Sequence, residues 1–169
     1  MPPLSPLSSN SQPLPAVGWR EWVALPDLGV SQVKAKVDTG ARTSTLHAFD
    51  IEYFEEGHGR HVRFKVHPLQ RDTRRTICAV APLLEKRHVR SSVGHVQERP
   101  IIKTPIYLGG QQWVIELTLT NRDVMGFRML LGREAIRRRF LVDPGSSYLM
   151  GTPIDSATWL AAIDEPDFS

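Results

Sequence analysis

The chain has 169 residues, of which 41% are hydrophobic and 23% charged, and it contains one cysteine, Cys78. This length fits one domain of ordinary size, a single cysteine excludes an internal disulfide framework, and no run approaches the roughly 20 apolar residues of a membrane-spanning helix. The net charge is +3, but residues 57–103 alone carry eleven basic and three acidic side chains. Such a region attracts nucleic acid, anionic lipid or an acidic substrate; a solvated basic surface is the simplest alternative.

The first fifteen residues, rich in Pro and Ser, predict a disordered arm because they offer too little apolar surface to offset the entropy of ordering. They contain no Lys or Arg and no continuous apolar run, so they do not resemble a signal peptide. We therefore expect a cytoplasmic protein with no membrane association. A folded domain is predicted over residues 16–151, followed by an acidic tail over 152–169 in which residues 156–163 are a candidate short helix.

Strand patterns begin soon after the arm. Residues 19–26 predict a strand that ends at a proline, and residues 33–37 predict a half-buried strand because apolar and basic side chains alternate there. Five more runs have strand character: 50–54, 61–66, 76–81, 101–108 and 112–119.

Turns and helices complete the pattern. Glycines at 57–59 and at 109–110 indicate hairpin turns between pairs of strands. The best helical pattern covers residues 133–140, directly after Leu130-Leu131-Gly132. Many short strands separated by Gly and Pro turns predict an all-β barrel or sandwich.

The sharpest local signal is Val37-Asp38-Thr39-Gly40-Ala41, which follows a predicted strand directly. The carboxylate of Asp38 would stand at the strand end, the Thr39 hydroxyl can lock the turn, and Gly40 lets a substrate backbone approach closely. Alone, Asp-Thr-Gly is a common turn, so its meaning depends on the rest of the chain.

Two later segments give this turn a context. Met129-Leu130-Leu131-Gly132-Arg133 has the apolar residues and the glycine that a buried strand needs to pass behind an acidic loop. Residues 90–98 are polar and contain Gly94 and small serines, which suits a mobile flap over a cleft.

Together, these features resemble the retropepsin-like aspartic peptidases. More closely, the chain is similar to a bacterial family within that fold, often catalogued as ATP-dependent zinc proteases. The similar segments are Asp38-Thr39-Gly40-Ala41-Arg42-Thr43-Ser44, Glu98-Arg99-Pro100, residues 117–122 and Leu130-Leu131-Gly132-Arg133.

The resemblance covers residues 17–150. It implies a retropepsin-like closed β-barrel, the acid protease fold, with one short helix after Leu130-Leu131-Gly132. It also implies catalytic roles for Asp38, Thr39 and Gly40, with Leu130, Leu131, Gly132 and Arg133 as structural support of the site.

The sequence contains no motif that would support the zinc or the ATP in the name of that family. The His-Glu-x-x-His pattern of common zinc peptidases is absent from the sequence, as is the Gly-x-x-x-x-Gly-Lys-Ser/Thr phosphate loop. His58, His61 and His67 fall in a turn and a strand, and a structural zinc site there is a minor alternative. We therefore expect no metal and no cofactor.

Aspartic proteolysis requires two carboxylates about 3 Å apart that share one proton. The sequence contains one Asp-Thr-Gly loop, and Asp123 and Asp143 lie in ordinary turn or loop contexts. The second carboxylate must then come from Asp38 of another copy, which predicts a homodimer about a two-fold axis.

The family resemblance implies a substrate class as well, because members are associated with ligases that attach glutamates. An acidic or glutamylated peptide or protein and a functional link to a glutamate ligase are therefore expected, and the basic stretch 57–103 agrees with this. Substrate contacts are expected from two residues of the acidic loop and from the flap segment, with Lys86 and Arg87 as neighbours. The expected contact residues are Ala41, Arg42, Arg90, Ser91, Ser92, Gly94 and Arg99.

One position departs from the retropepsin pattern. The residue after Asp-Thr-Gly-Ala is typically acidic in those enzymes and pairs with the arginine of the Gly-Arg motif, but here it is Arg42. Arg133 therefore needs another acidic partner.

Several other residues have simpler interpretations. Trp19, Trp22 and Trp113 are expected to be core or interface anchors, because aromatic side chains bury large areas. Cys78 lies in an apolar run and is interpreted as a small core residue. The arginines at 137–139 are expected on the solvent-facing side of a helix.

Three functions remain in competition on the sequence alone. The chain could be a homodimeric aspartic endopeptidase, a catalytically silent binding or regulatory module of the same fold, or a basic adaptor for nucleic acid or the ribosome. Asp38→Asn separates them, since only the first function would be lost.

Overall fold

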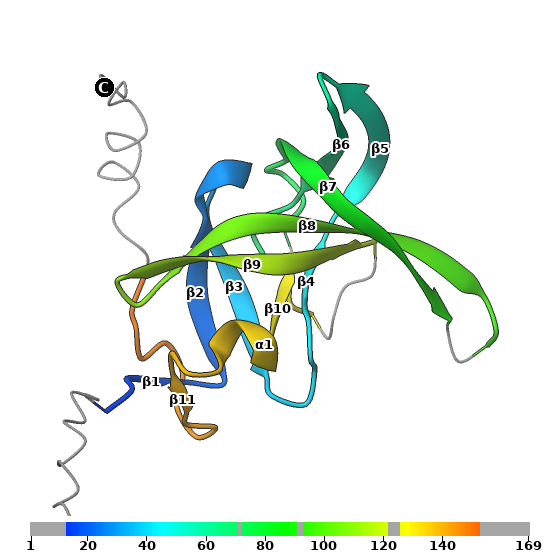
Figure 1. Cartoon of the computed structure of the whole chain (residues 1–169). Coiled ribbons are helices and arrows are strands. Elements are labelled where there is room, and N and C mark those ends of the chain that lie inside the picture. Colours follow the sequence, from blue (N-terminus) through cyan, green and yellow to red (C-terminus); the bar gives the residue numbers. More distant parts are fainter. Residues whose placement is uncertain (1–12, 71, 91–92, 122–125, 153–169) are drawn as a thin grey trace, which may run out of the picture.

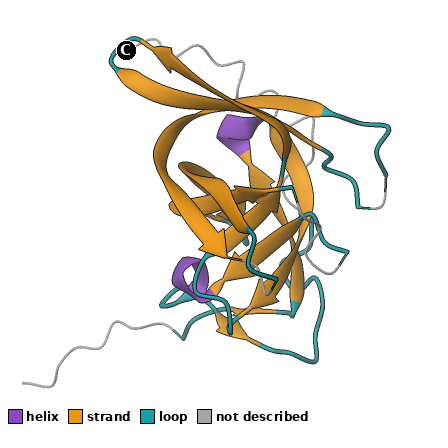
Figure 2. Cartoon of the chain, turned by 90° about the vertical axis from the view of Figure 1, so that its right-hand side faces the viewer, coloured by secondary structure: helices purple, strands orange, loops and turns teal. Residues whose placement is uncertain are grey.

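The computed structural model describes residues 13–70, 72–90, 93–121 and 126–152. Strands dominate, and the described helical parts are one 3-10 turn, η1 (Pro26–Leu28), and one short α-helix, α1 (Arg133–Ile136) (Figure 2). The strands are β1 (Ala16–Val17), β2 (Arg20–Leu25), β3 (Val30–Asp38), β4 (Ser44–His47), β5 (Phe49–Glu56), β6 (Gly59–Val66), β7 (Ile77–Arg90), β8 (Val96–Leu108), β9 (Gln111–Thr120), β10 (Met129–Gly132) and β11 (Leu141–Val142).

Six of these strands form a closed barrel in the order β2-β3-β10-β4-β9-β8. The barrel closes because β2 pairs with β8 as well as with β3, through Ala24 and Tyr107. β7, β6 and β5 continue the sheet beyond β8 (Figure 1), and inward side chains of β6 and β7, such as Phe64 and Ala79, belong to the same core as the barrel. The predicted all-β, retropepsin-like closed barrel with one short helix is therefore confirmed.

Alternation along the strands builds the core. In β3, Val33, Ala35 and Val37 are buried while the lysines between them are only half-buried, as expected for a strand with one face turned inward. Each large apolar side chain buried in this way contributes about 1.5–3 kcal/mol. The largest fully buried apolar side chains of the barrel include Leu25, Leu46, Ile102, Ile106, Leu117, Leu119, Met129 and Leu131.

β10 lies between two strands that are close neighbours in the sequence. It runs parallel to β3 and antiparallel to β4. The connection from β3 to β4, residues 39–43, therefore passes around the end of β10 instead of forming a hairpin. This arrangement brings the start of α1 next to the acidic loop.

α1 ends earlier than the sequence pattern predicted, at Ile136 and not at residue 140. Arg137 leaves the helical region (φ −52°, ψ 137°), and Arg138 has a positive φ of 66°. The reason lies in the next strand: β11 pairs in parallel with β1, and the Leu141 N–H donates to the Pro15 carbonyl. The chain has to become extended at that point, so the helix cannot continue.

One buried carboxylate ties both ends of the described chain together. Glu21 in β2 is fully buried, and its oxygens accept hydrogen bonds from the backbone N–H groups of Gly18 at 2.7 Å, Leu149 at 2.9 Å and Met150 at 3.0 Å. Three donors satisfy a charge that would otherwise be costly to bury. Residues 1–12 and 153–169, with the candidate helix at 156–163, lie outside the described residues.

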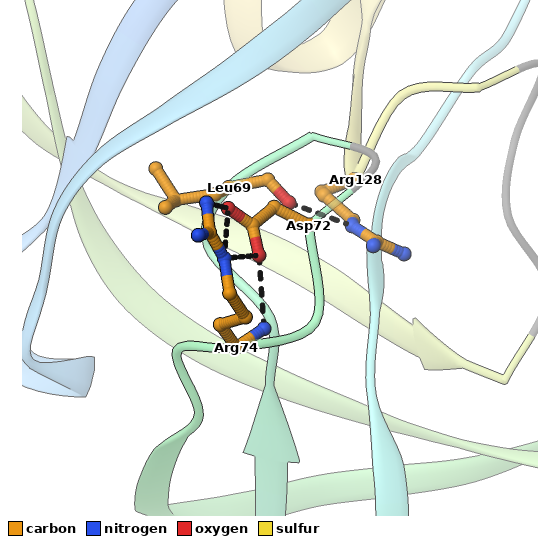
Figure 3. A network of polar contacts seen from close by, with 4 residues as sticks. All are labelled: Leu69, Asp72, Arg74 and Arg128. Atoms are coloured by element: carbon orange, nitrogen blue, oxygen red, sulfur yellow. Dashed lines mark hydrogen bonds and ion pairs between the residues drawn. The ribbon is translucent and has the colours of Figure 1, made fainter.

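The connection between β6 and β7 is held against the start of β10. Arg74 donates hydrogen bonds from its guanidinium and its backbone N–H to the Asp72 carboxylate, at 2.7–3.2 Å (Figure 3). The buried Arg128, just before β10, donates from Nε to the Leu69 carbonyl at 3.4 Å. The Arg74 side-chain and backbone hydrogen bonds lower the pKa of Asp72 to about 2.

Cys78 is a correction to the sequence interpretation, because its side chain is exposed and not part of the core. β7 alternates strictly at this point, so that Ala79 and Ala81 face inward and Cys78 and Val80 face solvent. The outer face of this strand is also apolar, so the alternation cannot be seen in the sequence.

No helix among the described residues is long and apolar enough to cross a membrane.

Candidate active site

The acidic loop begins at Asp38, the last residue of β3. The Asp38 Oδ1 accepts hydrogen bonds from the N–H groups of Gly40 at 2.9 Å and Ala41 at 3.2 Å. A short carboxylate side chain that binds backbone donors two and three residues ahead fixes a tight turn. The carboxylate is thereby oriented by its own loop, while Thr39 and Gly40 are exposed at the surface.

The start of α1 supports this loop from behind. Gly132 pairs with Asp38 at the ends of β10 and β3, and the next two N–H groups, of Arg133 and Glu134, donate to the carbonyls of Ala41 at 2.8 Å and Arg42 at 3.1 Å. These contacts satisfy N–H groups that the helix itself cannot satisfy. They also fix the backbone of the second half of the loop, at Ala41 and Arg42.

Gly132 permits this close approach. A Cβ atom at this position would lie 2.5 Å from the Thr43 carbonyl oxygen and 2.9 Å from the Arg42 carbonyl oxygen. The Gly132 N–H donates to the Ser44 Oγ at 3.0 Å. The predicted support segment, Leu130-Leu131-Gly132-Arg133, thus lies directly behind the acidic loop, with both leucines buried.

Arg133 contacts the loop in a way the sequence analysis did not foresee. Its Nη1 donates to the Gly40 carbonyl at 3.2 Å, so that among the described residues a backbone oxygen takes the place of the acidic partner that was expected. Arg42 is exposed and, among the described residues, has no ion-pair partner. Arg133 therefore still contacts the acidic loop, although Arg42 stands at the position where the retropepsins typically have an acidic residue.

A pocket of about 520 Å³, which we call the loop pocket, lies beside the acidic loop. It is formed by the end of that loop, the outer face of β9, the segment around α1 and one residue of β7. Its charged residues are three arginines and two glutamates. The lining residues are Arg42, Thr43, Ser44, Arg87, Trp113, Val114, Ile115, Glu116, Glu134, Ala135 and Arg139.

The predicted flap segment is the tip of a long hairpin formed by β7 and β8, which projects beyond the barrel (Figure 1). Strand pairing places Arg87 opposite Arg99 and Arg90 opposite Val96. Side chains of opposite residues share a face, and odd and even positions alternate. Arg87 and Arg99 therefore lie on one face of the hairpin, and Arg90 lies on the other.

This placement separates two residues that the sequence analysis grouped together. Because Arg87 lines the loop pocket, Arg99 lies on the face that is turned toward that pocket, whereas Arg90 is on the opposite face. Gly94 is exposed near the tip with φ 83°. Ser91 and Ser92 lie outside the described residues.

The pocket also contains residues that sequence reasoning missed. Glu116 and Val114 alternate with the buried Ile115 and Leu117 of β9, so the period-two pattern could have marked them as outward-facing. Arg139 lies with its guanidinium carbon 4.7 Å from the centroid of the Trp113 ring. That contact joins residues far apart in the sequence, and no local pattern indicates it.

The histidines do not gather into a metal site. His61 Nδ1 contacts the Gly59 carbonyl and its ring stacks on Phe54, while His67 Nδ1 contacts the Arg75 carbonyl. Within residues 13–152, apart from the gaps, no group of three or more His, Cys, Asp or Glu side chains is arranged to hold a metal ion.

Comparison with known proteins gives a consistent result. A family model described as RimB-like, "Retropepsin-like aspartic endopeptidase RimB", matches residues 16–153. A solved structure from Legionella pneumophila subsp. pneumophila str. Philadelphia 1, of a protein with unknown function, superposes with a TM-score of 0.67 at 28% identity. The match covers 80% of this chain and 98% of that one.

Curated relatives carry a different name. A protein from Parasynechococcus marenigrum, named "Probable alpha-L-glutamate ligase", is 51% identical over 135 residues, and a protein of the same name from Shewanella halifaxensis is 45% identical over 139 residues. These matches cover 80% and 82% of this chain but only 29% and 30% of the relatives. The chain thus spans less than a third of the length of these relatives.

Proposed function

Because the chain belongs to the family of RimB-like, retropepsin-like aspartic endopeptidases, we propose that it hydrolyses peptide bonds as a homodimer, through the Asp38 carboxyls of two copies. The observation that carries the proposal is the Asp38 loop. Its carboxylate is oriented by two backbone N–H groups, and the loop is fixed from behind by Arg133 and Glu134. We assign this activity to the domain over residues 16–151.

The loop geometry suits acid–base chemistry on a water molecule. The Gly40 and Ala41 N–H groups both bind Oδ1, which leaves Oδ2 of Asp38 for the water. An ionised carboxylate takes a proton from that water as its oxygen attacks the peptide carbonyl, and the protonated carboxyl of the second copy donates its proton to the carbonyl oxygen. When the tetrahedral intermediate collapses, the carboxyl that took the proton from water passes it to the amide nitrogen, one hydroxyl of the intermediate returns its proton to the other carboxylate, and the C–N bond breaks to give a carboxylic acid and an amine.

The second carboxyl makes dimerisation part of the chemistry. Two carboxylates at close range cannot both ionise readily, so the pair holds one proton between them. A two-fold axis through the loops would bring two Asp38 side chains together by an isologous contact. Thr39 and Gly40 are exposed in the single chain, so this surface is accessible to a second copy.

The arginine of the loop pocket without an ion-pair partner favours an acidic substrate. Arg42, Arg87 and Arg139 line the pocket together with Glu116 and Glu134, and Arg87 is paired with Glu85, but Arg42 has no ion-pair partner among the described residues. Guanidinium groups present paired donors in a plane that matches a carboxylate. Together with relatives named as glutamate ligases, this supports an acidic or glutamylated peptide as substrate and a functional link to a glutamate ligase.

The test is the Asp38→Asn variant, assayed on acidic peptides. Asn keeps the side-chain oxygen that binds Gly40 and Ala41 but cannot act as an acid or base, so hydrolysis should fall by about 10²–10⁴-fold or more. Asp27→Asn, a change at an exposed acid in η1, is the matched control and should retain full rate. Full activity of the Asp38→Asn protein would refute the mechanism.

A mixing experiment tests the shared pair separately. An excess of Asp38→Asn protein added to the unmodified protein should suppress its activity as mixed dimers form, because each mixed dimer has only one acid. Activity that stays constant across the mixing series would place both reacting groups in one chain. Activity should also persist with a metal chelator and without ATP; zinc-dependent rescue after chelation would contradict the carboxyl mechanism.

A further inference from the structure

Three consecutive arginines follow α1 and line a second pocket. We call Arg137, Arg138 and Arg139 the arginine ridge; with residues 13–15 and Gln111 they surround a space of about 570 Å³. Arg139 lines this pocket and the loop pocket as well. The two pockets therefore share Arg139 as a lining residue.

Arg139 is held in place at this junction. Its guanidinium lies over the Trp113 ring at 4.7 Å and its Nη1 is 3.5 Å from the Gln111 Oε1. Trp113 is fixed in turn, because its Nε1 donates to the Ala135 carbonyl at 3.1 Å. Arg139 covers one face of the Trp113 indole, which lines the loop pocket. The lining residues of the second pocket include no aromatic side chain on which a nucleic-acid base could stack.

Arg138 stands out for its backbone and its charge. It has a φ of 66°, a conformation that costs free energy in any residue with a side chain and that recurs at functional positions. Arg137 pairs with Glu134 at 3.4 Å, but Arg138 has no acidic partner among the described residues. An exposed guanidinium without a partner, beside a pocket, is suited to a carboxylate from another molecule.

The ridge is within reach of a peptide bound at the acidic loop. α1 is four residues long, so its axis spans about 6 Å, whereas an extended peptide advances about 3.3 Å per residue. A peptide chain needs only a few residues beyond the loop pocket to arrive at Arg138.

We propose that the arginine ridge is a second binding site for a carboxylate-rich stretch of peptide, several residues away from the bond that is cleaved. The proposal rests on the proposed function, because the same acidic chain would occupy the loop pocket and the ridge at once. The consequence is a preference for long acidic chains over short ones.

The experiment measures binding and not hydrolysis, so it does not depend on catalysis. Fluorescein-labelled peptides of four and of ten glutamates are titrated into full-length Asp38→Asn protein, with and without Arg138→Gln, and anisotropy gives each Kd. Loss of one arginine–carboxylate pair should raise the Kd of the ten-residue peptide about fivefold. Arg60→Gln, at an exposed arginine of the β5–β6 hairpin, makes the same change in net charge and is the matched control.

The outcomes separate the proposal from a general charge effect. A selective loss with Arg138→Gln on the ten-residue peptide supports the ridge. The proposal would be overturned if Arg60→Gln weakened binding as much as Arg138→Gln does, or if Arg138→Gln weakened the binding of both peptides equally. It would also be overturned if a ten-nucleotide single strand bound as tightly as the ten-residue peptide and depended on Arg138 to the same extent. If the unmodified protein cleaves no acidic peptide, the proposed function fails, and the titration still reports on the ridge.

Arg138→Gly separates binding from folding. Glycine adopts a positive φ without strain, so this variant should unfold at a higher temperature than the unmodified protein and still bind the ten-residue peptide more weakly. A variant that binds with unchanged affinity would mean that Arg138 has only a structural role.

Discussion

At the scale of single residues, Gly132 is the point where the acidic loop and its support touch most closely. The Thr43 carbonyl oxygen would be 2.5 Å from a Cβ atom, far inside contact distance. The neighbour is backbone, so it cannot rotate away as a side chain would. Either β10 or the loop would have to move, and the position of Asp38 depends on both.

Gly132→Ala should therefore lower the free energy of unfolding by about 2 kcal/mol or more, in the range of overpacked buried sites, and should reduce hydrolysis as well. The measurement is urea unfolding followed by tryptophan fluorescence. Gly59→Ala is the matched control, because its Cβ would lie 3.5 Å from the His61 ring, an ordinary contact, and a surface change of this kind stays within about 0.5 kcal/mol. Equal stability of the two variants would show that the loop tolerates displacement.

At the scale of elements, the connection between β6 and β7 shows how charge can fix a segment that has little core of its own. Asp72 is held by Arg74 within the segment, and the segment is held by Arg128 through the Leu69 carbonyl. The Arg128 carbonyl in turn accepts from the His47 N–H at 2.7 Å. These contacts connect the segment to the start of β10 and, through Arg128, to the end of β4.

The depressed pKa of Asp72, about 2, makes this contact dependent on pH. A carboxyl whose pKa is lower in the folded than in the unfolded state stabilises the fold fully above the unfolded value, about 4, and loses that contribution as the pH falls toward 2. The stability difference between the unmodified protein and Asp72→Asn should therefore shrink between pH 4 and pH 2. Chemical unfolding at several pH values checks this; a constant difference would mean that the Arg74 contact does not depend on the charge.

The strands illustrate what local sequence can predict. Alternation in β3 and the glycines at the two hairpin turns predicted those elements correctly, because they depend on residues within a few positions. β7 and β8 extend much further than predicted, to Arg90 and from Val96, since their outer halves are charged and have no buried face. Pairing between the two strands, not burial, maintains them there.

At the scale of the whole molecule, Glu21 connects segments from both ends of the described chain. Glu21 lies in β2, in the wall of the barrel. Its carboxylate accepts hydrogen bonds from the N–H group of Gly18, just before β2, and from those of Leu149 and Met150, near the other end of the described chain. The sequence analysis did not single out Glu21, because a glutamate between apolar residues in a strand usually faces solvent. Its partners are backbone groups that no side-chain pattern reveals.

Glu21→Gln should destabilise the fold by about 2–4 kcal/mol. The amide keeps one acceptor oxygen but places an NH₂ group against a backbone donor, which leaves buried donors without an acceptor. Calorimetry gives the stability, and hydrogen exchange at residues 146–150 shows whether the loss begins there. Glu52→Gln, at an exposed acid of β5, is the control; if both variants lose the same amount, the three buried contacts contribute nothing beyond the charge.

The candidate site shows the same division between local and distant information. Asp38, Gly40 and the Leu130-Leu131-Gly132-Arg133 segment could be identified from motifs, because each is a short run with a recognisable chemistry. The loop pocket could not, since Arg87 of β7, Trp113 of β9 and Arg139 between α1 and β11 come from three distant segments that only the fold brings together. The split of Arg90 and Arg99 onto opposite faces likewise follows from strand register.

The contact between Gly40 and Arg133 joins residues 93 positions apart, and this separation has a consequence for how the protein is made. Chains whose contacts are distant in sequence fold slowly, and synthesis on the ribosome proceeds from the N-terminus. Arg133, which helps to fix the loop, is translated 93 residues after Gly40. The acidic loop therefore acquires its supported shape only after this later segment has been made, and a nascent chain carries Asp38 before its loop is fixed.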